Sequence, residues 1–255
     1  MSALRHFALF FVLLISSAYA TKTADVILND EIVPLGMLDG ILKDRGYEIT
    51  IIPTTTLDAK EIMERNADLL IILGGRQSVT HIELNSYFVD EIQLIKDRTA
   101  HGKQTLGLCL GAQLMAIAFG GKVEKGPIVE QGWISLEATA SSSQNLAVQS
   151  LLDSKTKVYA SHEDIVILPA GATLLAKSVL YDQVFSVGTA FAVQFHPEAT
   201  PEITKNWLVL FGKQDDVERK HKVNELAFAE NRKGIERFWS LYLDQVEAQL
   251  PRAVE

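Results

Sequence analysis

Residues 104–116 (QTLGLCLGAQLMA) place the only cysteine of the 255-residue chain between two glycines, in the pattern Gly107-x-Cys109-x-Gly111. The pattern stands where a strand-like run meets a helix-like one, which is how a strand–turn–helix elbow presents a nucleophile. Glycines two residues to either side permit the close backbone approach of such a turn. The following helix directs its positive end at the sulfur, which favours the thiolate. We therefore predict that Cys109 is a nucleophile, with a buried core cysteine as the alternative.

A cysteine nucleophile needs a general base, and the base needs a group that orients it. Four of the six histidines lie in the N-terminal segment or in charged, helix-like stretches: His6, His81, His101 and His221. His162 and His196 remain. His196 follows an apolar strand-like run, and Glu198 two residues later can fold back on the imidazole and fix its tautomer, with Pro197 holding the bend. We predict His196 as base and Glu198 as its orienting group; a plain turn histidine before proline is the alternative.

Acyl transfer also requires hydrogen-bond donors for the oxyanion. The apolar run 67–75 ends in the pair Gly74-Gly75, where backbone N–H groups can face a ligand. The N–H of Leu110, the residue after the nucleophile, would be the second donor of an elbow site. A plain turn is the alternative for the glycine pair.

The elements that must position these residues alternate along the first half of the chain. Four strand-like runs are 24–30, 47–54, 67–75 and 103–111, and the helical patterns are 34–44, 57–66, 82–101 and 112–119. Strands separated by helices form βαβ units and a parallel sheet. Beyond Gly121, short strand-like runs with turn signals between them predict an antiparallel extension: 122–140, 157–169, 172–180 and 183–195. We expect an α/β domain over 21–200 and a charged helical extension over 201–255 that packs on the same domain.

The first twenty residues have the pattern of a secretory signal peptide. A short polar start precedes the apolar run 7–15, and the segment closes with Ala18-Tyr19-Ala20. We expect cleavage after Ala20, export to the periplasm or medium, and no stable membrane span afterwards; an uncleaved N-terminal anchor is the alternative. An unpaired thiol is a liability in an oxidising compartment, so it is either buried and inert or kept for its chemistry. The net charge of −8 argues against a nucleic-acid partner.

Three motifs together resemble the class I glutamine amidotransferases of the Cys-His-Glu type: 107–113 (GLCLGAQ), 194–198 (QFHPE) and 72–79 (ILGGRQSV). Within that family, 161–178 is similar to the amidotransferase domain of GMP synthetases, and 130–133 (EQGW) to its substrate-facing stretch. The resemblance covers roughly 24–200 and implies a three-layer, flavodoxin-like fold with a mostly parallel sheet. It assigns the nucleophile, base and orienting group to Cys109, His196 and Glu198, and the oxyanion donors to Gly75 and Leu110. The substrate-binding residues that it implies are Gly74, Gln113, Gln131, Gly132 and Trp133.

Two departures from the family shape the functional expectation. The chain shows no synthase domain, and the predicted signal peptide would separate it from ATP and from such partners. We therefore expect an exported hydrolase of the γ-glutamyl amide bond in glutathione or γ-glutamyl peptides, with no metal, no cofactor and no synthase partner. One alternative is a glutaminase subunit like that of GMP synthetase, which would release ammonia from glutamine. The other is a catalytically silent binding module.

Overall fold

The computed structural model describes residues 21–211 and 216–250, so the predicted signal peptide lies outside the described residues. Its centre is an eight-stranded sheet in the order β2-β1-β3-β4-β10-β9-β8-β6. The first five of these strands run parallel to one another: β2 (Tyr47–Pro53), β1 (Lys22–Leu28), β3 (Leu69–Ile72), β4 (Gln104–Leu108) and β10 (Ala190–Val193). The other three pair antiparallel: β9 (Asp182–Val187), β8 (Thr173–Lys177) and β6 (Glu137–Ala138).

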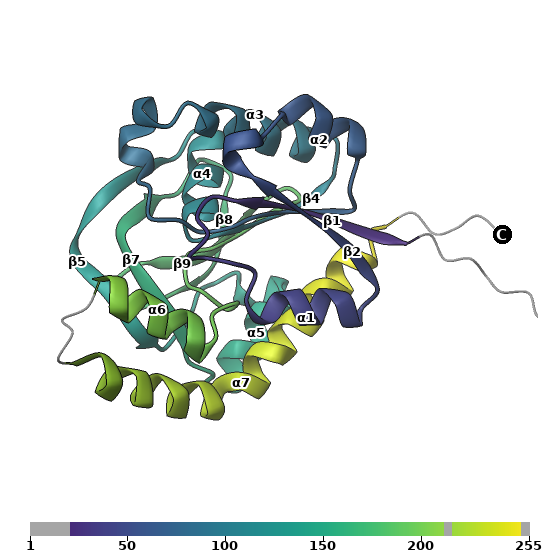
Figure 1. Cartoon of the computed structure of the whole chain (residues 1–255). Coiled ribbons are helices and arrows are strands. Elements are labelled where there is room, and N and C mark those ends of the chain that lie inside the picture. The colour runs from purple at the N-terminus through teal and green to yellow at the C-terminus, as the bar shows by residue number, and fades with distance from the viewer. Residues whose placement is uncertain (1–20, 212–215, 251–255) are drawn as a thin grey trace, which may run out of the picture.

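Helices cover both faces of the sheet and make three layers (Figure 1). On one face lie α1 (Met37–Asp44), α5 (Leu146–Asp153) and α7 (Val217–Glu247). On the other lie α2 (Ala59–Arg65), α3 (Tyr87–Ala100) and α4 (Leu110–Ala118). Because β3 is covered on both faces, its sequence LLII is apolar without alternation and fully buried. The predicted α/β fold with a mostly parallel sheet is confirmed.

A two-stranded antiparallel ribbon stands apart from the sheet. It pairs β5 (Lys122–Ile134) with β7 (Val158–Ile167), with a register shift between Lys125 and Glu130. The sequence predicted that these strands would join an antiparallel extension, but only β6, β8 and β9 do so, and β10 returns to the parallel part beside β4. In β5 only Gly126 and Glu130 are buried, so most of this strand forms an exposed wall rather than part of the core.

The C-terminal helices pack on the same domain. On α7, buried side chains recur at the helical spacing of three and four residues: Ile235, Phe238, Trp239, Tyr242, Leu243 and Val246. They join the core under the sheet, and α7 also contacts α5 and α6 (Pro201–Phe211). None of the described helices combines the length and the apolarity needed to cross a membrane.

Several element boundaries differ from the sequence prediction. The helix expected over 82–101 is a 3-10 turn, Val79–Leu84, followed by α3. The helix after the cysteine begins at Leu110, two residues earlier than expected. The helix α5 was missed because the flanking Ser, Gln and Asn residues indicate a turn. Its start signal was nevertheless present, since the Asn145 side chain accepts a hydrogen bond from the N–H of Val148 at 3.0 Å.

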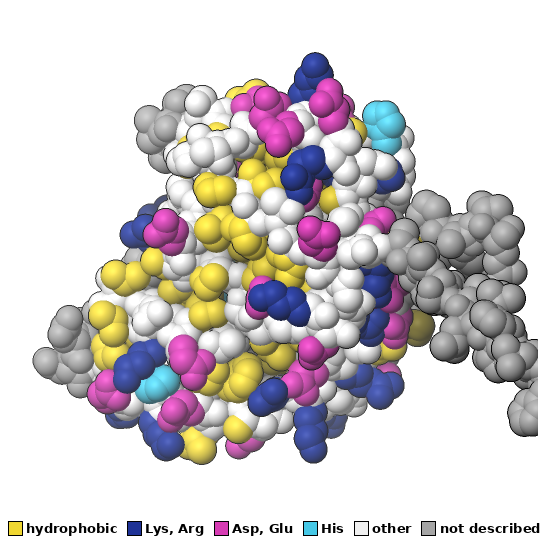
Figure 2. Space-filling view, turned by 45° about the vertical axis from the view of Figure 1, so that its right-hand side comes forward, with side chains coloured by type: hydrophobic (Ala, Val, Ile, Leu, Met, Phe, Trp, Pro, Cys, Tyr) yellow, Lys and Arg dark blue, Asp and Glu magenta, His cyan; other side chains and the backbone are white. Residues whose placement is uncertain are grey.

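Figure 2 shows acidic and basic side chains interspersed over one face of the molecule, with hydrophobic side chains reaching the surface between them. The charges on this face therefore do not gather into a region of one sign.

Candidate active site

Cys109 occupies a strained elbow between β4 and α4. Its φ of 50° and ψ of −103° lie in a region that L-residues rarely adopt, and its N–H donates to the carbonyl of Val193 at 2.8 Å. A side chain at Gly107 would come within 2.6 Å of the Gly111 backbone, and one at Gly111 would collide with the carbonyl of Ile72. Both flanking glycines are therefore required by close approach, as the pattern predicted.

His196 lies beside the thiol and is held by Glu198. Its Nδ1 is 2.7 Å from Glu198 Oε1, and the two side chains are 3% and 0% exposed. A Cβ on Gly74 would fall 3.2 Å from His196 Cε1 and 3.4 Å from Cys109 Cβ, so this glycine leaves the space in which ring and thiol meet. Burial disfavours the charged ring, but the Glu198 carboxylate and then the adjacent Cys109 outweigh it and raise the pKa of His196 to about 10. The imidazolium is therefore favoured at neutral pH.

The short segment that carries the base is fixed from two sides. The N–H of His196 donates to the carbonyl of Tyr159 on β7 at 2.7 Å. The indole N–H of Trp239 on α7 donates to the carbonyl of Pro197 at 3.0 Å. The C-terminal helix thus contributes directly to the position of the segment that carries His196.

A third support comes from the start of α1. The N–H of Met37 donates to the carbonyl of Glu198 at 2.9 Å. Gly36 before it has a φ of +54°, and any side chain there would collide with that same carbonyl. Gly36 is therefore required for the close approach of α1 to the segment that carries Glu198, and no local sequence pattern indicates this contact.

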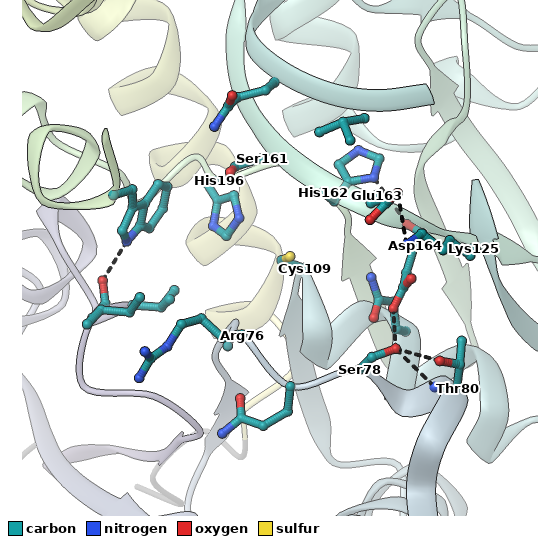
Figure 3. A pocket seen from close by; sticks show the side chains of 18 residues that line it. Arg76, Ser78, Thr80, Cys109, Lys125, Ser161, His162, Glu163, Asp164 and His196 are labelled. Atoms are coloured by element: carbon teal, nitrogen blue, oxygen red, sulfur yellow. Dashed lines mark hydrogen bonds and ion pairs between the residues drawn. The ribbon is translucent and has the colours of Figure 1, made fainter. Parts of the chain in front are cut away.

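These groups open into a cavity of about 530 Å³ (Figure 3). One side, which we call the polar wall, consists of Ser78, Thr80, Lys125, Glu163 and Asp164. A second group of lining residues, which we call the loop wall, consists of Ile32, Val33, Arg76 and Trp207. In Figure 3, Cys109 lies between His196 and the residues of the polar wall.

The structure distributes the other predicted residues around this cavity. Gly75, Gln113 and Gln131 line it. Leu110 is the first residue of α4, and the first N–H groups of a helix have no acceptor within the helix. By contrast, Gly132 and Trp133 lie next along β5 but outside the lining formed by the described residues, and the Trp133 ring packs instead on Tyr159 and Phe228.

A second histidine–glutamate pair borders the cavity. His162, which lines it, has Nε2 3.1 Å from Glu130 Oε2 and Nδ1 3.2 Å from the carbonyl oxygen of Asp164. Glu130 also accepts from Ser178 Oγ at 2.6 Å and from Gln183 Nε2 at 2.7 Å. Burial raises the pKa of Glu130, but the hydrogen bonds from His162, Ser178 and Gln183 outweigh it and hold the pKa below its ordinary value. The role of His162 is open from the sequence alone, and no local pattern predicts this network.

Within the described residues, no three His, Cys, Asp or Glu side chains gather as metal ligands. The groups that meet beside the cavity are a thiol, an imidazole and a carboxylate.

Comparison with known proteins places this geometry in a family. Residues 36–212 match the family model of the class I glutamine amidotransferases. The chain is 31% identical over 180 residues to the glutamine-hydrolyzing GMP synthase of Aeropyrum pernix, a match that covers 67% of this chain and 33% of that protein. It thus spans about a third of the length of that relative. It is 31% identical over 163 residues to one subunit of the glutamine-hydrolyzing GMP synthase of Methanosarcina barkeri, covering 62% of this chain and 78% of that protein.

The crystal structure of a Thermotoga maritima glutamine amidotransferase superposes with a TM-score of 0.77 at 26% identity, covering 90% of this chain and 100% of that one. The chain therefore belongs to the class I glutamine amidotransferase family.

Proposed function

We propose that the protein is an exported cysteine amidohydrolase that cleaves the γ-glutamyl amide bond of small compounds, glutathione or γ-glutamyl peptides. The observation that carries the proposal is the contact of an elbow cysteine with a buried imidazole whose Nδ1 is 2.7 Å from a carboxylate. Export rests on the sequence of the first twenty residues alone.

The first half-reaction forms a thioester. Cys109 Sγ attacks the γ-carbonyl carbon, and the resulting oxyanion accepts hydrogen bonds from the N–H groups of Gly75 and Leu110, each contributing about 3 kcal/mol in the transition state. The C–N bond then breaks, and the His196 imidazolium gives its proton to the departing amine. The γ-glutamyl group remains bound to sulfur.

The second half-reaction returns the free enzyme. His196, now neutral, takes a proton from water as the water oxygen attacks the thioester carbon. The C–S bond breaks, glutamate leaves, and the thiolate and imidazolium are restored. Glu198 holds Nδ1 throughout, so that the other ring nitrogen serves both proton transfers.

Two features of the cavity support a γ-glutamyl compound as the substrate. The polar wall offers Lys125 together with Glu163 and Asp164, and such charges suit an α-amino-acid group that carries both signs. The volume of about 530 Å³ falls in the range of about 300–1,000 Å³ that buries drug-sized ligands. Free glutamine is smaller than such ligands, so there is space for a leaving group larger than ammonia.

The test is glutamate release measured by mass spectrometry from the chain beginning at Thr21, with glutathione and with glutamine as separate substrates. Glutamate from glutathione, and its loss in Cys109→Ala, would support the proposal. Release from glutamine alone would contradict it in favour of a glutaminase. Glutamate from neither, nor from a panel of other γ-glutamyl peptides, would favour a silent binding module.

A glutaminase role is the second candidate. It is favoured by the similarity to the Methanosarcina barkeri GMP synthase component over 78% of that protein. In that case a synthase partner would receive the ammonia, and hydrolysis of glutamine should rise when such a partner is added.

A further inference from the structure

The two walls of the cavity differ in chemistry, and the reaction assigns a different part of the substrate to each. On the polar wall, Ser78 Oγ donates to Asp164 Oδ2 at 2.5 Å, and Lys125 pairs with Glu163 at 3.2 Å. The loop wall contributes three apolar side chains and one guanidinium. A substrate bound across Cys109 therefore meets two unlike surfaces.

The loop wall is one connected unit. Arg76 donates from Nε to Asp30 Oδ2 at 2.6 Å and from Nη2 to Oδ1 at 3.2 Å. Asp30 in turn accepts from the N–H of Ile32 at 3.2 Å, and its carbonyl accepts from the N–H of Val33 at 2.9 Å. Asp30, in the turn after β1, thus links the guanidinium of Arg76 to the backbone of the segment that carries Ile32 and Val33.

Trp207 joins this turn to the catalytic base. Its indole N–H donates to the carbonyl of Ile32 at 2.6 Å, and its ring meets the His196 ring edge-on, with centroids 4.7 Å apart. Trp207 therefore ties the loop wall to His196. In Figure 3, Arg76 lies on the His196 side of Cys109, whereas Ser78, Lys125 and Asp164 of the polar wall lie on the other side.

Proton transfer decides which end of the substrate faces the loop wall. The base must reach the nitrogen that leaves, because it protonates that nitrogen as the C–N bond breaks. The leaving group thus extends past His196 toward the loop wall, and the charged end of the glutamyl group faces the polar wall. This assignment rests on the proposed function.

We propose that the loop wall is the leaving-group subsite and that it selects γ-glutamyl dipeptides with an apolar C-terminal residue. The side chain of that residue packs on Ile32, Val33 and the edge of Trp207, and its carboxylate pairs with Arg76. Among the described residues the guanidinium bonds to Asp30 alone, through Nε and Nη2, so Nη1 can meet a carboxylate. Glutathione fits less well, since its cysteine carboxyl is tied up as a neutral amide.

The experiment compares kcat/KM of the chain from Thr21 on five substrates: γ-Glu-Leu, γ-Glu-Gly, γ-glutamyl isoamylamide, glutathione and glutamine. We expect kcat/KM for γ-Glu-Leu to exceed kcat/KM for γ-Glu-Gly by about tenfold, which is the discrimination that a small hydrophobic pocket achieves. The isoamylamide has the same branched chain without the carboxylate. Its kcat/KM should be about fivefold lower than that of γ-Glu-Leu, because it lacks the ion pair with Arg76 and a partly exposed ion pair has an effect of that size.

Three variants separate the two contacts. Arg76→Gln should lower kcat/KM for γ-Glu-Leu about fivefold relative to kcat/KM for the isoamylamide. Ile32→Ala should reduce the ratio of kcat/KM for γ-Glu-Leu to that for γ-Glu-Gly by a similar factor of about five. Lys125→Gln is the matched control, because it removes a cation from the opposite wall. It should lower kcat/KM for all five substrates by the same factor and leave the ratios between substrates unchanged.

Three results would overturn the inference, and the first two distinguish the subsite from the proposed function. If the enzyme hydrolyses glutamine and γ-Glu-Gly as efficiently as γ-Glu-Leu, the proposed function stands and the subsite is wrong. If it hydrolyses none of the five while folded, the proposed function fails and the subsite fails with it. Unchanged substrate ratios in Arg76→Gln and Ile32→Ala would also reject the subsite.

Discussion

Two histidine–glutamate pairs border the same cavity, and they differ in what else each partner contacts. In the first, His196 Nδ1 bonds Glu198 Oε1, while Glu198 Oε2 has no partner among the residues that the structure describes. In the second, Glu130 accepts hydrogen bonds from Ser178, Gln183 and His162. Glu198 therefore contacts one imidazole ring, whereas Glu130 links its own strand, β5, to β7 and β9.

The difference extends to the rings. Both nitrogens of His162 face oxygen atoms, one of Glu130 and one of Asp164, so its ring is committed to structure. His196 uses only Nδ1 on its carboxylate and lies beside the sulfur. Of the two rings, His196 therefore meets the requirement for the proposed base, whereas both nitrogens of His162 are already occupied by protein oxygen atoms.

The largest expected effect separates the two histidines by kinetics. His196→Asn should lower kcat by about a thousandfold or more, because general acid–base catalysis is lost. His162→Asn should act mainly through KM, since it loosens the segment 161–164 that lines the cavity. Steady-state glutamate release measures both, and similar losses of kcat in the two variants would contradict the comparison.

The second effect concerns stability. Glu130→Gln should lower the free energy of unfolding by about 3 kcal/mol at pH 7, because a buried, three-partner carboxylate is replaced by a mismatched amide. Because the folded-state pKa of Glu130 is depressed, its contribution is present above the ordinary value near 4.5 and is lost as pH falls through the folded pKa. Urea unfolding at pH 7 and pH 3 should therefore show a difference that shrinks at low pH.

A matched control for this measurement is Glu163→Gln, which removes a carboxylate from a largely exposed pair with Lys125. It should cost no more than about 1 kcal/mol. An equal cost for the two variants would mean that the Glu130 network adds nothing beyond an ordinary surface pair.

The third effect is a shift in pH dependence. The Glu198 carboxylate raises the pKa of His196 to about 10, and activity should fall above that pH as the imidazolium loses its proton. Glu198→Gln removes the negative charge, so the alkaline limb of kcat/KM should move down by about one to two pH units. Glu130→Gln should leave the limb in place. If the alkaline limb of kcat/KM moves in Glu130→Gln as much as in Glu198→Gln, both glutamates affect the pKa of His196 and the comparison is wrong.

The smallest effect tests how the base is held from outside the cavity. Trp239→Phe keeps an aromatic ring but removes the hydrogen bond to the Pro197 carbonyl, and the loss of this bond should cost about 1 kcal/mol of stability beyond the packing lost with the smaller ring, and a few-fold in kcat. Trp133→Phe is a matched control for stability, because the buried Trp133 Nε1 has no partner among the described residues. If thermal unfolding shows the same loss in both variants, the Pro197 contact is not the cause.

Local patterns predicted what lies close together in the chain. The elbow at Cys109 needs two glycines within five residues, and His196 and Glu198 are two residues apart, so their relation is readable from the sequence. The βαβ alternation predicted the parallel part of the sheet for the same reason, because each apolar run specifies its own element.

Contacts between distant segments could not be predicted in this way. Glu130 meets Ser178 and Gln183 across 48 and 53 residues, and Trp239 reaches Pro197 across 42. The spacing of polar residues along the sequence does not indicate which of them form hydrogen bonds across such distances. The substrate role expected for Gly132 and Trp133 stays a prediction. Gln131 of that stretch reaches the cavity lining, whereas Trp133, two residues further on and on the same face of the strand, packs on Tyr159 and Phe228 instead.

The bond from Trp239 to the Pro197 carbonyl has a consequence for the order in which the molecule acquires its parts. Cys109 lies near the middle of the chain, whereas the indole that secures the segment of its base lies on the last described helix, whose apolar stripe completes one face of the core. Synthesis runs from the N-terminus to the C-terminus, so we expect the thiol to exist for most of that time without a fixed base. We therefore expect the segment that carries His196 to reach its final position only after α7 has packed on the core.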